Sequence, residues 1–139
     1  MAIHFYNEEV PTPTFKKKET KDWMKQVAAS QGKKIGEISY IFCNDNKILE
    51  VNKQYLGHDY YTDIITFDDT EGDRINGDIF ISVDTVNSNA EQYQQSFDKE
   101  LHRVIIHGIL HLCGIDDQSP EERANMIQHE NEALALIGM

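Results

Sequence analysis

The stretch FDKELHRVIIHGILHLCGIDD, residues 97–117, predicts a helix at the centre of the fold. Its apolar residues recur at the three- and four-residue spacing of a single helix face. They are Leu101, Val104, Ile105, Ile109 and Leu112. Gly114 follows this stripe and can adopt the positive φ with which many helices end. We therefore expect a central helix over residues 97–112.

His107 and His111 lie four residues apart in this stretch, so both side chains project from one helix face. Two imidazoles at this spacing can share one metal ion, as they do in HExxH metalloproteases. The glutamate that serves those enzymes as general base is replaced here by Gly108, which argues against a protease. Gly108 also leaves room for another element to approach the helix. The alternative is that both histidines are hydrogen-bonded core residues without a metal.

The turn at Gly114 can return a carboxylate toward the open side of the histidine pair. Asp116 and Asp117 are both candidates by position. Carboxylate oxygens are accepted zinc ligands at about 2.0–2.2 Å. The residues alone therefore predict a metal site on the central helix and leave the third ligand open between these two acids.

The rest of the chain predicts a layered domain of strands and helices. Runs of β-branched and aromatic residues predict strands over residues 3–6, 38–43, 64–67 and 78–82. Periodicity and capping residues predict further helices over residues 16–31, 44–56, 84–94 and 119–138. Four strands and about five helices in mixed order indicate an α+β or α/β fold, and we expect residues 1–139 to form a single domain.

Two of these helices carry specific expectations. Asp84 is expected to cap the helix that follows it. Ser119 and Glu122 are spaced as a capping box at the start of the last helix. The inward residues of that last helix are expected to be Met126, Ile127, Leu134 and Ile137.

The chain is acidic, with 24 Asp and Glu against 13 Lys and Arg and a net charge of −11. Such a surface repels phosphate and argues against non-specific nucleic-acid binding, although a divalent metal can still recruit phosphate locally. No run approaches the roughly 18 apolar residues of a membrane span, and no secretory signal is recognisable. We expect a cytoplasmic protein without membrane association, whose Cys43 and Cys113 are reduced thiols.

Three stretches resemble the YbeY family of endoribonucleases. HGILHLCGIDD (residues 107–117) is similar to the signature His-Gly-x-Leu-His-Leu-x-Gly-(Tyr)-Asp-His. YLGHDYYTDIITFD (residues 55–68) resembles the family segment Tyr-Arg-x-x-Asp-x-x-Thr-Asn/Asp-Val-Leu-Ser-Phe, and NGDIFIS (residues 76–82) resembles its Gly-Asp-Ile strand. Order, spacing and length agree over almost the whole chain.

The resemblance implies an α+β domain with a four-stranded mixed sheet and a metal at the mouth of a cleft. It implies a metal-dependent, single-strand-specific endoribonuclease that acts in small-subunit ribosomal RNA maturation and ribosome quality control. The implied cofactor is one zinc ion per chain, with another divalent transition metal as the alternative. The implied partners are single-stranded or ribosomal RNA and the small ribosomal subunit or assembly proteins, with no DNA expected.

The chain departs from the family pattern at two positions. The third metal-binding histidine of the family falls on Asp117, so the resemblance assigns the metal to His107, His111 and Asp117. Leu56 stands where the family has an arginine thought to engage phosphate. His58 and Lys53 are the neighbouring residues that could replace this cation.

The candidates for catalysis are Asp63 and His58. Asp63 lies in the family segment beside the cleft, where it either fixes a histidine tautomer or caps a turn at the start of a strand. Arg103, one turn before His107, either meets phosphate or pairs with Glu100.

Two other functions compete with the nuclease. A non-catalytic ribosome-assembly factor with a structural metal agrees with Leu56 and with the acidic surface. A small metalloprotease-like hydrolase agrees with the histidine pair but lacks the base at Gly108.

Overall fold

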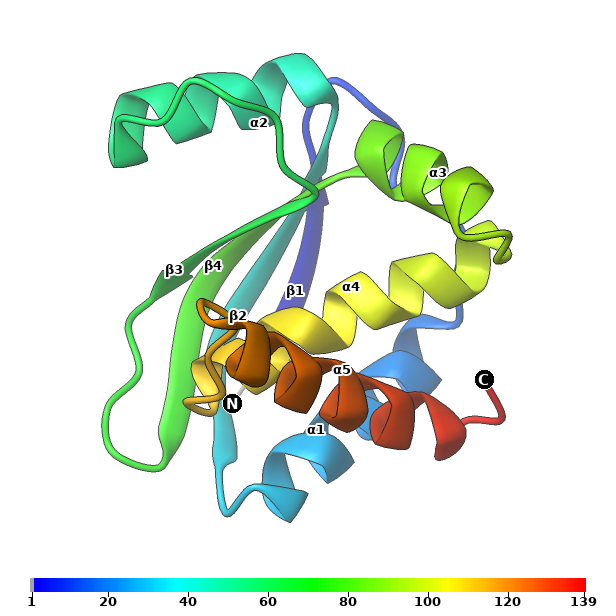
Figure 1. The fold of residues 1–139 in the computed structure, drawn as a ribbon. Helices are drawn as coiled ribbons and strands as arrows, with labels where there is room; N and C mark the ends of the chain where they lie inside the picture. The colour runs from blue at the N-terminus through cyan, green and yellow to red at the C-terminus, as the bar shows by residue number, and fades with distance from the viewer. Residues whose placement is uncertain (1) are drawn as a thin grey trace.

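Four strands form one mixed sheet in the computed structural model, which describes residues 2–139 (Figure 1). In spatial order the strands are β1 (Ala2–Asn7), β2 (Lys34–Cys43), β4 (Arg74–Ser82) and β3 (Ile64–Asp68). The first three are mutually parallel, whereas β3 pairs antiparallel with β4 and forms one edge of the sheet. The mixed four-stranded sheet is therefore confirmed.

Helices cover both faces of the sheet. They are α1 (Lys17–Ser30), α2 (Asp45–Val51), α3 (Val83–Gln92), α4 (Phe97–Leu112) and α5 (Pro120–Ala135). A π-helical turn, η1 (Asn52–Leu56), continues α2. Figure 1 shows α2 on one face, whereas α4 crosses the other face with α1 and α5 packed beside it. The described residues thus form an α+β fold with the expected five α-helices.

The main core lies between the sheet and α4. Its fully buried side chains include Ile38, Ile79, Leu101 and Ile105, together with Tyr40. The Tyr40 hydroxyl donates a hydrogen bond of 2.6 Å to the Ile105 carbonyl, which ties β2 to the middle of α4. The predicted apolar stripe of the central helix therefore faces the sheet, as expected.

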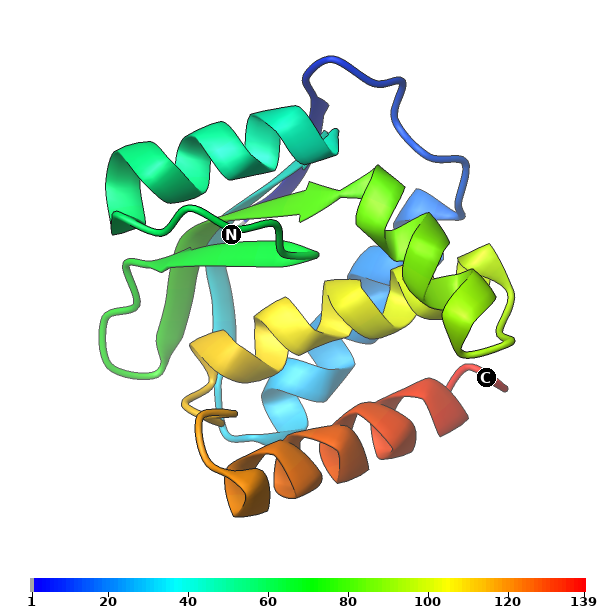
Figure 2. The same cartoon turned by 45° about the horizontal axis from the view of Figure 1, so that its top comes forward.

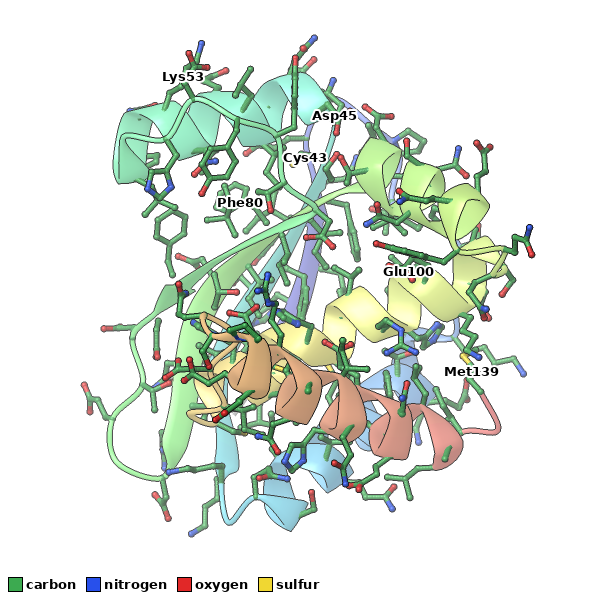
Figure 3. All side chains as sticks on the ribbon, viewed as in Figure 1. Cys43, Asp45, Lys53, Phe80, Glu100 and Met139 are labelled. Atoms are coloured by element: carbon green, nitrogen blue, oxygen red, sulfur yellow. The ribbon has the colours of Figure 1, made fainter. Side chains whose placement is uncertain are left out.

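A smaller core lies under α2 on the other face. Cys43, Ile48, Val51 and Ile65 form it, with Phe67 and Phe80 packed against them. Figure 3 shows Cys43 and Phe80 between α2 and the sheet. Ile64, the residue before Ile65 on β3, packs against the main core instead, so successive residues of β3 point to opposite faces.

Gly108 marks the closest approach of α4 to the sheet. A Cβ at this position would lie 2.9 Å from Cδ1 of Ile79 on β4 and 3.4 Å from Cδ1 of Ile64 on β3. The space predicted at Gly108 is therefore filled by the sheet. This contact sets the histidine-bearing turns of α4 beside β3.

Several local expectations were wrong. Ser82, not Asp84, caps α3 by accepting from the Thr85 N–H, and Asp84 instead accepts from the Asp45 N–H. Ile127 on α5 is 52% exposed, and Ile137, which lies beyond the end of α5, is 37% exposed, so neither is buried. The expected capping box of Ser119 and Glu122 is present.

Both cysteines are free thiols. Burial raises the pKa of Cys43 to about 12 and that of Cys113 to about 11, which keeps both protonated at neutral pH. Within residues 2–139, no helix has the length and apolar character needed to cross a membrane.

Candidate functional site

A pocket of about 380 Å³ opens where α4, α5 and the edge strand β3 meet. Strand β3 and the residues before it contribute Thr62, Asp63, Ile64 and Thr66, and α4 contributes Glu100, Arg103, Val104, His107 and His111. Asp117 and Glu130 complete the lining. The structure therefore brings the three expected metal ligands and Asp63 into one pocket.

His107 lies between two carboxylates in this pocket. Its Nδ1 is 2.7 Å from Oε2 of Glu130 on α5, and its Nε2 is 3.3 Å from Oδ2 of Asp117. An ionised carboxylate only accepts hydrogen bonds, so Nδ1–H donates to Glu130. In the neutral ring this leaves the Nε2 lone pair directed at Asp117, the arrangement that a metal-binding histidine requires.

Glu130 is itself buried and held in place by a second partner. Its Oε1 accepts a hydrogen bond of 3.0 Å from Nη1 of Arg103, whose Nη2 donates to Oδ1 of Asn131 at 2.8 Å. Arg103 therefore pairs with Glu130 rather than with Glu100. The pair satisfies a carboxylate that would otherwise be costly to bury, and so fixes the position of the His107 partner.

Carboxylates dominate the electrostatics of the pocket. Burial alone would lower the pKa of His107, but the hydrogen bond to Glu130 and the charges of Glu130, Asp117 and Asp63 raise it above 6.5 overall. Burial raises the pKa of Asp63 above 3.8, with partial relief from His107. Burial likewise raises the pKa of Glu100 above 4.5, against the attraction of Arg103. The pocket therefore favours a bound cation.

The donor set fits a divalent metal, although its atoms are not gathered into a finished coordination shell. Within residues 2–139, no three His, Cys, Asp or Glu side chains are spaced as a closed metal cluster. His107 is nevertheless oriented with Nε2 toward Asp117, and His111 lines the same pocket one turn along α4. Asp117 is half-buried in the lining, whereas the alternative ligand Asp116 is exposed. Two imidazoles and one carboxylate would leave a fourth position open on zinc.

Asp63 lines the pocket but does not orient His107, because that role belongs to Glu130. Its Oδ2 accepts from Nδ2 of Asn89 at 3.4 Å, and its backbone carbonyl accepts from the Ser82 N–H. Asp63 is therefore tied to α3 at its N-cap Ser82 and at Asn89, while its carboxyl group remains at the pocket wall.

The other expected residues lie outside the pocket lining. His58 follows η1, with Nδ1 3.0 Å from the Tyr60 hydroxyl. Lys53 pairs with Asp59 at 3.3 Å and points outward from the helix (Figure 3). Leu56 is the last residue of η1 and is exposed. Among the described lining residues, Arg103 is thus the one Lys or Arg.

Glu130 is the site residue that the sequence reasoning missed. It lies on the inward stripe of α5 with Met126, Ala133 and Leu134. A carboxylate on an otherwise apolar stripe needs a buried partner, and this was the available signal.

Comparisons with known proteins agree with this fold and show the family to which the chain belongs. Residues 3–138 match the family model described as Endoribonuclease YbeY. A Phocaeicola vulgatus protein named Endoribonuclease YbeY is 67% identical over 137 residues, covering 99% of each chain. A Bacteroides thetaiotaomicron protein of the same name is 63% identical over 136 residues, covering 98% of this chain and 99% of its own.

A solved structure of lower sequence identity has a similar fold. The solution structure of a Thermotoga maritima protein matches with a TM-score of 0.66 and 26% identity, over 96% of this chain and 87% of that one. The full-length match to the family model and the two high-identity relatives lead to one conclusion. This chain belongs to the YbeY endoribonuclease family.

Proposed function

We propose that this chain is a metal-dependent endoribonuclease that cleaves single-stranded RNA in the pocket between α4, α5 and β3. The ligands would be His107, His111 and Asp117, with one divalent ion per chain, zinc first and another transition metal as the alternative. The observation that carries the proposal is the imidazole of His107, which is oriented by Glu130 at 2.7 Å and directs Nε2 toward Asp117.

The acidic lining supports a metal as the electrophile. Asp63, Glu100, Asp117 and Glu130 face the pocket, against the guanidinium of Arg103. Such a lining repels phosphate unless a cation is bound. A divalent ion bound there would polarise a phosphoryl oxygen or lower the pKa of a bound water.

Other residues of the pocket would orient His107 and transfer a proton. Glu130 orients His107, and Arg103 in turn holds Glu130. Asp63 is the candidate for proton transfer, because its carboxyl group stands at the pocket wall with a raised pKa. Its partner in that transfer is either a water molecule or the RNA 2′-hydroxyl. His58, outside the lining, is the weaker candidate.

Family membership supports the biological setting. We place the activity in the cytoplasm, in small-subunit ribosomal RNA maturation and ribosome quality control. The partners would be the small ribosomal subunit or its assembly proteins. A non-catalytic assembly factor is the second candidate, and the exposed Leu56 favours it because the family has an arginine there.

Cleavage of a fluorescent single-stranded RNA tests the proposal. We expect the wild type to cleave it and a chelator to stop cleavage. We expect His111→Ala to lose at least about 100-fold in rate, because even a residue that only supports a ligand is typically worth 10- to 100-fold. His4→Ala is the matched control, since His4 is a half-exposed histidine on β1.

Two results would contradict the proposal of a metal-dependent nuclease. Cleavage that survives both chelator and His111→Ala would exclude the metal mechanism. Absence of cleavage in every variant, together with co-purification with small ribosomal subunits, would support the assembly factor instead.

A further inference from the structure

Exposed aromatic rings gather on residues 55–61, which we call the tyrosine segment. Tyr55, Tyr60 and Tyr61 are 62%, 55% and 57% exposed. Figures 1 and 2 show this part of the chain running from the end of η1 back alongside the helix to the start of β3. Large apolar rings gathered on a short exposed stretch are typical of a binding surface.

The Tyr55 and Tyr60 rings are held in place although each side chain is more than half exposed. The Tyr60 ring stacks on His58 with centroids 5.1 Å apart and planes inclined by 18°, and its hydroxyl contacts His58 Nδ1 at 3.0 Å. The Tyr60 carbonyl accepts a hydrogen bond of 2.9 Å from the buried Asn52 side chain. Tyr55 packs edge-on against Phe67 at 5.7 Å. A ligand would therefore meet Tyr55 and Tyr60 rings that are already ordered.

The segment adjoins the proposed catalytic pocket. Tyr61 is followed directly by Thr62 and Asp63, both of which line the pocket. Strand β3 forms the edge of the sheet, so nothing in the described chain continues the sheet beyond it. A flexible strand that crosses this edge can reach the pocket on one side and the tyrosine segment on the other.

The basic side chains of this region offer little electrostatic attraction for RNA phosphates. Lys53 is paired with Asp59 at 3.3 Å, and Arg103 is paired with the buried Glu130 at 3.0 Å. Stacking of bases on aromatic rings needs no cation and tolerates every base. It is also open only to bases that are not paired inside a helix.

We propose that Tyr60 and Tyr61, with His58 stacked behind Tyr60, form a platform for unpaired bases that flank the cleaved phosphodiester. The inference rests on the proposed function and deepens it by assigning the single-strand preference to named residues. Each stacked base adds about 5- to 150-fold in affinity, so two rings can replace much of the missing phosphate attraction.

Binding of a labelled single-stranded RNA tests the platform. Fluorescence anisotropy is measured on the protein with its metal retained, and the RNA carries 2′-O-methyl and phosphorothioate groups so that it stays intact. The doubly substituted Tyr60→Ala/Tyr61→Ala protein should bind at least about 10-fold more weakly than wild type. Tyr60→Phe/Tyr61→Phe should bind within about 2-fold of wild type, because phenyl rings stack as well. Tyr93→Ala is the matched control, a 58% exposed tyrosine at the end of α3.

A second RNA separates stacking from a structural effect. Abasic nucleotides placed at successive positions should weaken wild-type binding at one or two of them and leave the double alanine variant unaffected there. Double alanine binding equal to wild type would overturn the platform even if RNA cleavage remains chelator-sensitive. Wild-type protein that neither binds nor cleaves RNA would overturn the proposed function as well.

Discussion

Glu130 determines which ring nitrogen of His107 is left free for the pocket. A histidine can present either nitrogen, and the partner of the other nitrogen decides which. Glu130 takes Nδ1 at 2.7 Å and so assigns Nε2 to the pocket. It also raises the pKa of His107, because an imidazolium beside a carboxylate is stabilised. Glu130 therefore orients the His107 ring and makes its imidazolium form harder to deprotonate.

The first prediction concerns the pH dependence of metal binding. A proton and a metal compete for Nε2, so wild-type affinity should fall as pH drops through a value above 6.5, the ordinary pKa of histidine. Glu130→Gln removes the charge, so this midpoint should move to lower pH. At high pH the variant should bind about 10- to 100-fold more weakly, because the orienting carboxylate is gone. Zinc affinity measured from pH 5 to 9 checks both effects.

Glu132→Gln is the control for this prediction. It makes the same change on the exposed face of α5, so its pH profile should match the wild type. A midpoint unchanged in Glu130→Gln would contradict the role assigned to this carboxylate.

At the scale of elements, two glycines set the packing around the site. Gly77 on β4 lies against β3, where an added Cβ would come 2.4 Å from the Phe67 carbonyl oxygen. A Cβ added to Gly108 on α4 would come 2.9 Å from a side-chain methyl group of Ile79. A backbone atom cannot move without disturbing the strand pairing, whereas the end of an isoleucine side chain can.

Alanine at these two positions should therefore have unequal effects. Gly77→Ala should lower the free energy of unfolding by about 1–3 kcal/mol or more through overpacking. Gly108→Ala should cost less, because alanine is about 1 kcal/mol more favourable than glycine within a helix and offsets part of the strain. Urea denaturation of both variants against wild type measures the difference. A larger loss in Gly108→Ala would contradict the packing described here.

Sequence patterns predicted the elements because those patterns are local. The apolar stripe over residues 97–112 predicted α4, and the capping box at Ser119 predicted the start of α5. Asp84 was predicted as a cap because Ser82 was assigned to the strand over residues 78–82 and Asp84 is the next residue with a capping side chain. The contact that engages Asp84, the Asp45 N–H, exists only after α2 and α3 meet. Tertiary contacts of this kind do not appear in the sequence.

The same distinction applies to the site. His107 and His111 were predictable, because four residues along one helix fix their relative position. Glu130 lies 23 residues beyond His107 and meets it only when α5 docks on α4. Ile127 was expected on the buried face of α5, yet it is exposed, whereas Glu130 is buried. Periodicity identified a buried face but could not predict that a carboxylate would occupy it.

For the whole molecule, the net charge of −11 opposes binding of the proposed RNA substrate, so the attraction for RNA must come from particular regions of the surface. The acidic pocket is lined by α4 and lies on one side of β3. The tyrosine segment begins at the end of η1 and lies on the other side. A cation in the pocket and stacking beside it would supply the two attractions that an acidic surface lacks. The central claim is therefore that this chain carries its ion at His107, His111 and Asp117.

The most direct test is the metal content of the purified protein, measured by elemental analysis. Wild type and Asp116→Ala should each contain about one equivalent of one divalent metal per chain, as one three-ligand site requires. His107→Ala, His111→Ala and Asp117→Ala should each fall well below that value. Full metal content in both histidine variants, or its loss in Asp116→Ala but not in Asp117→Ala, would contradict the assigned site.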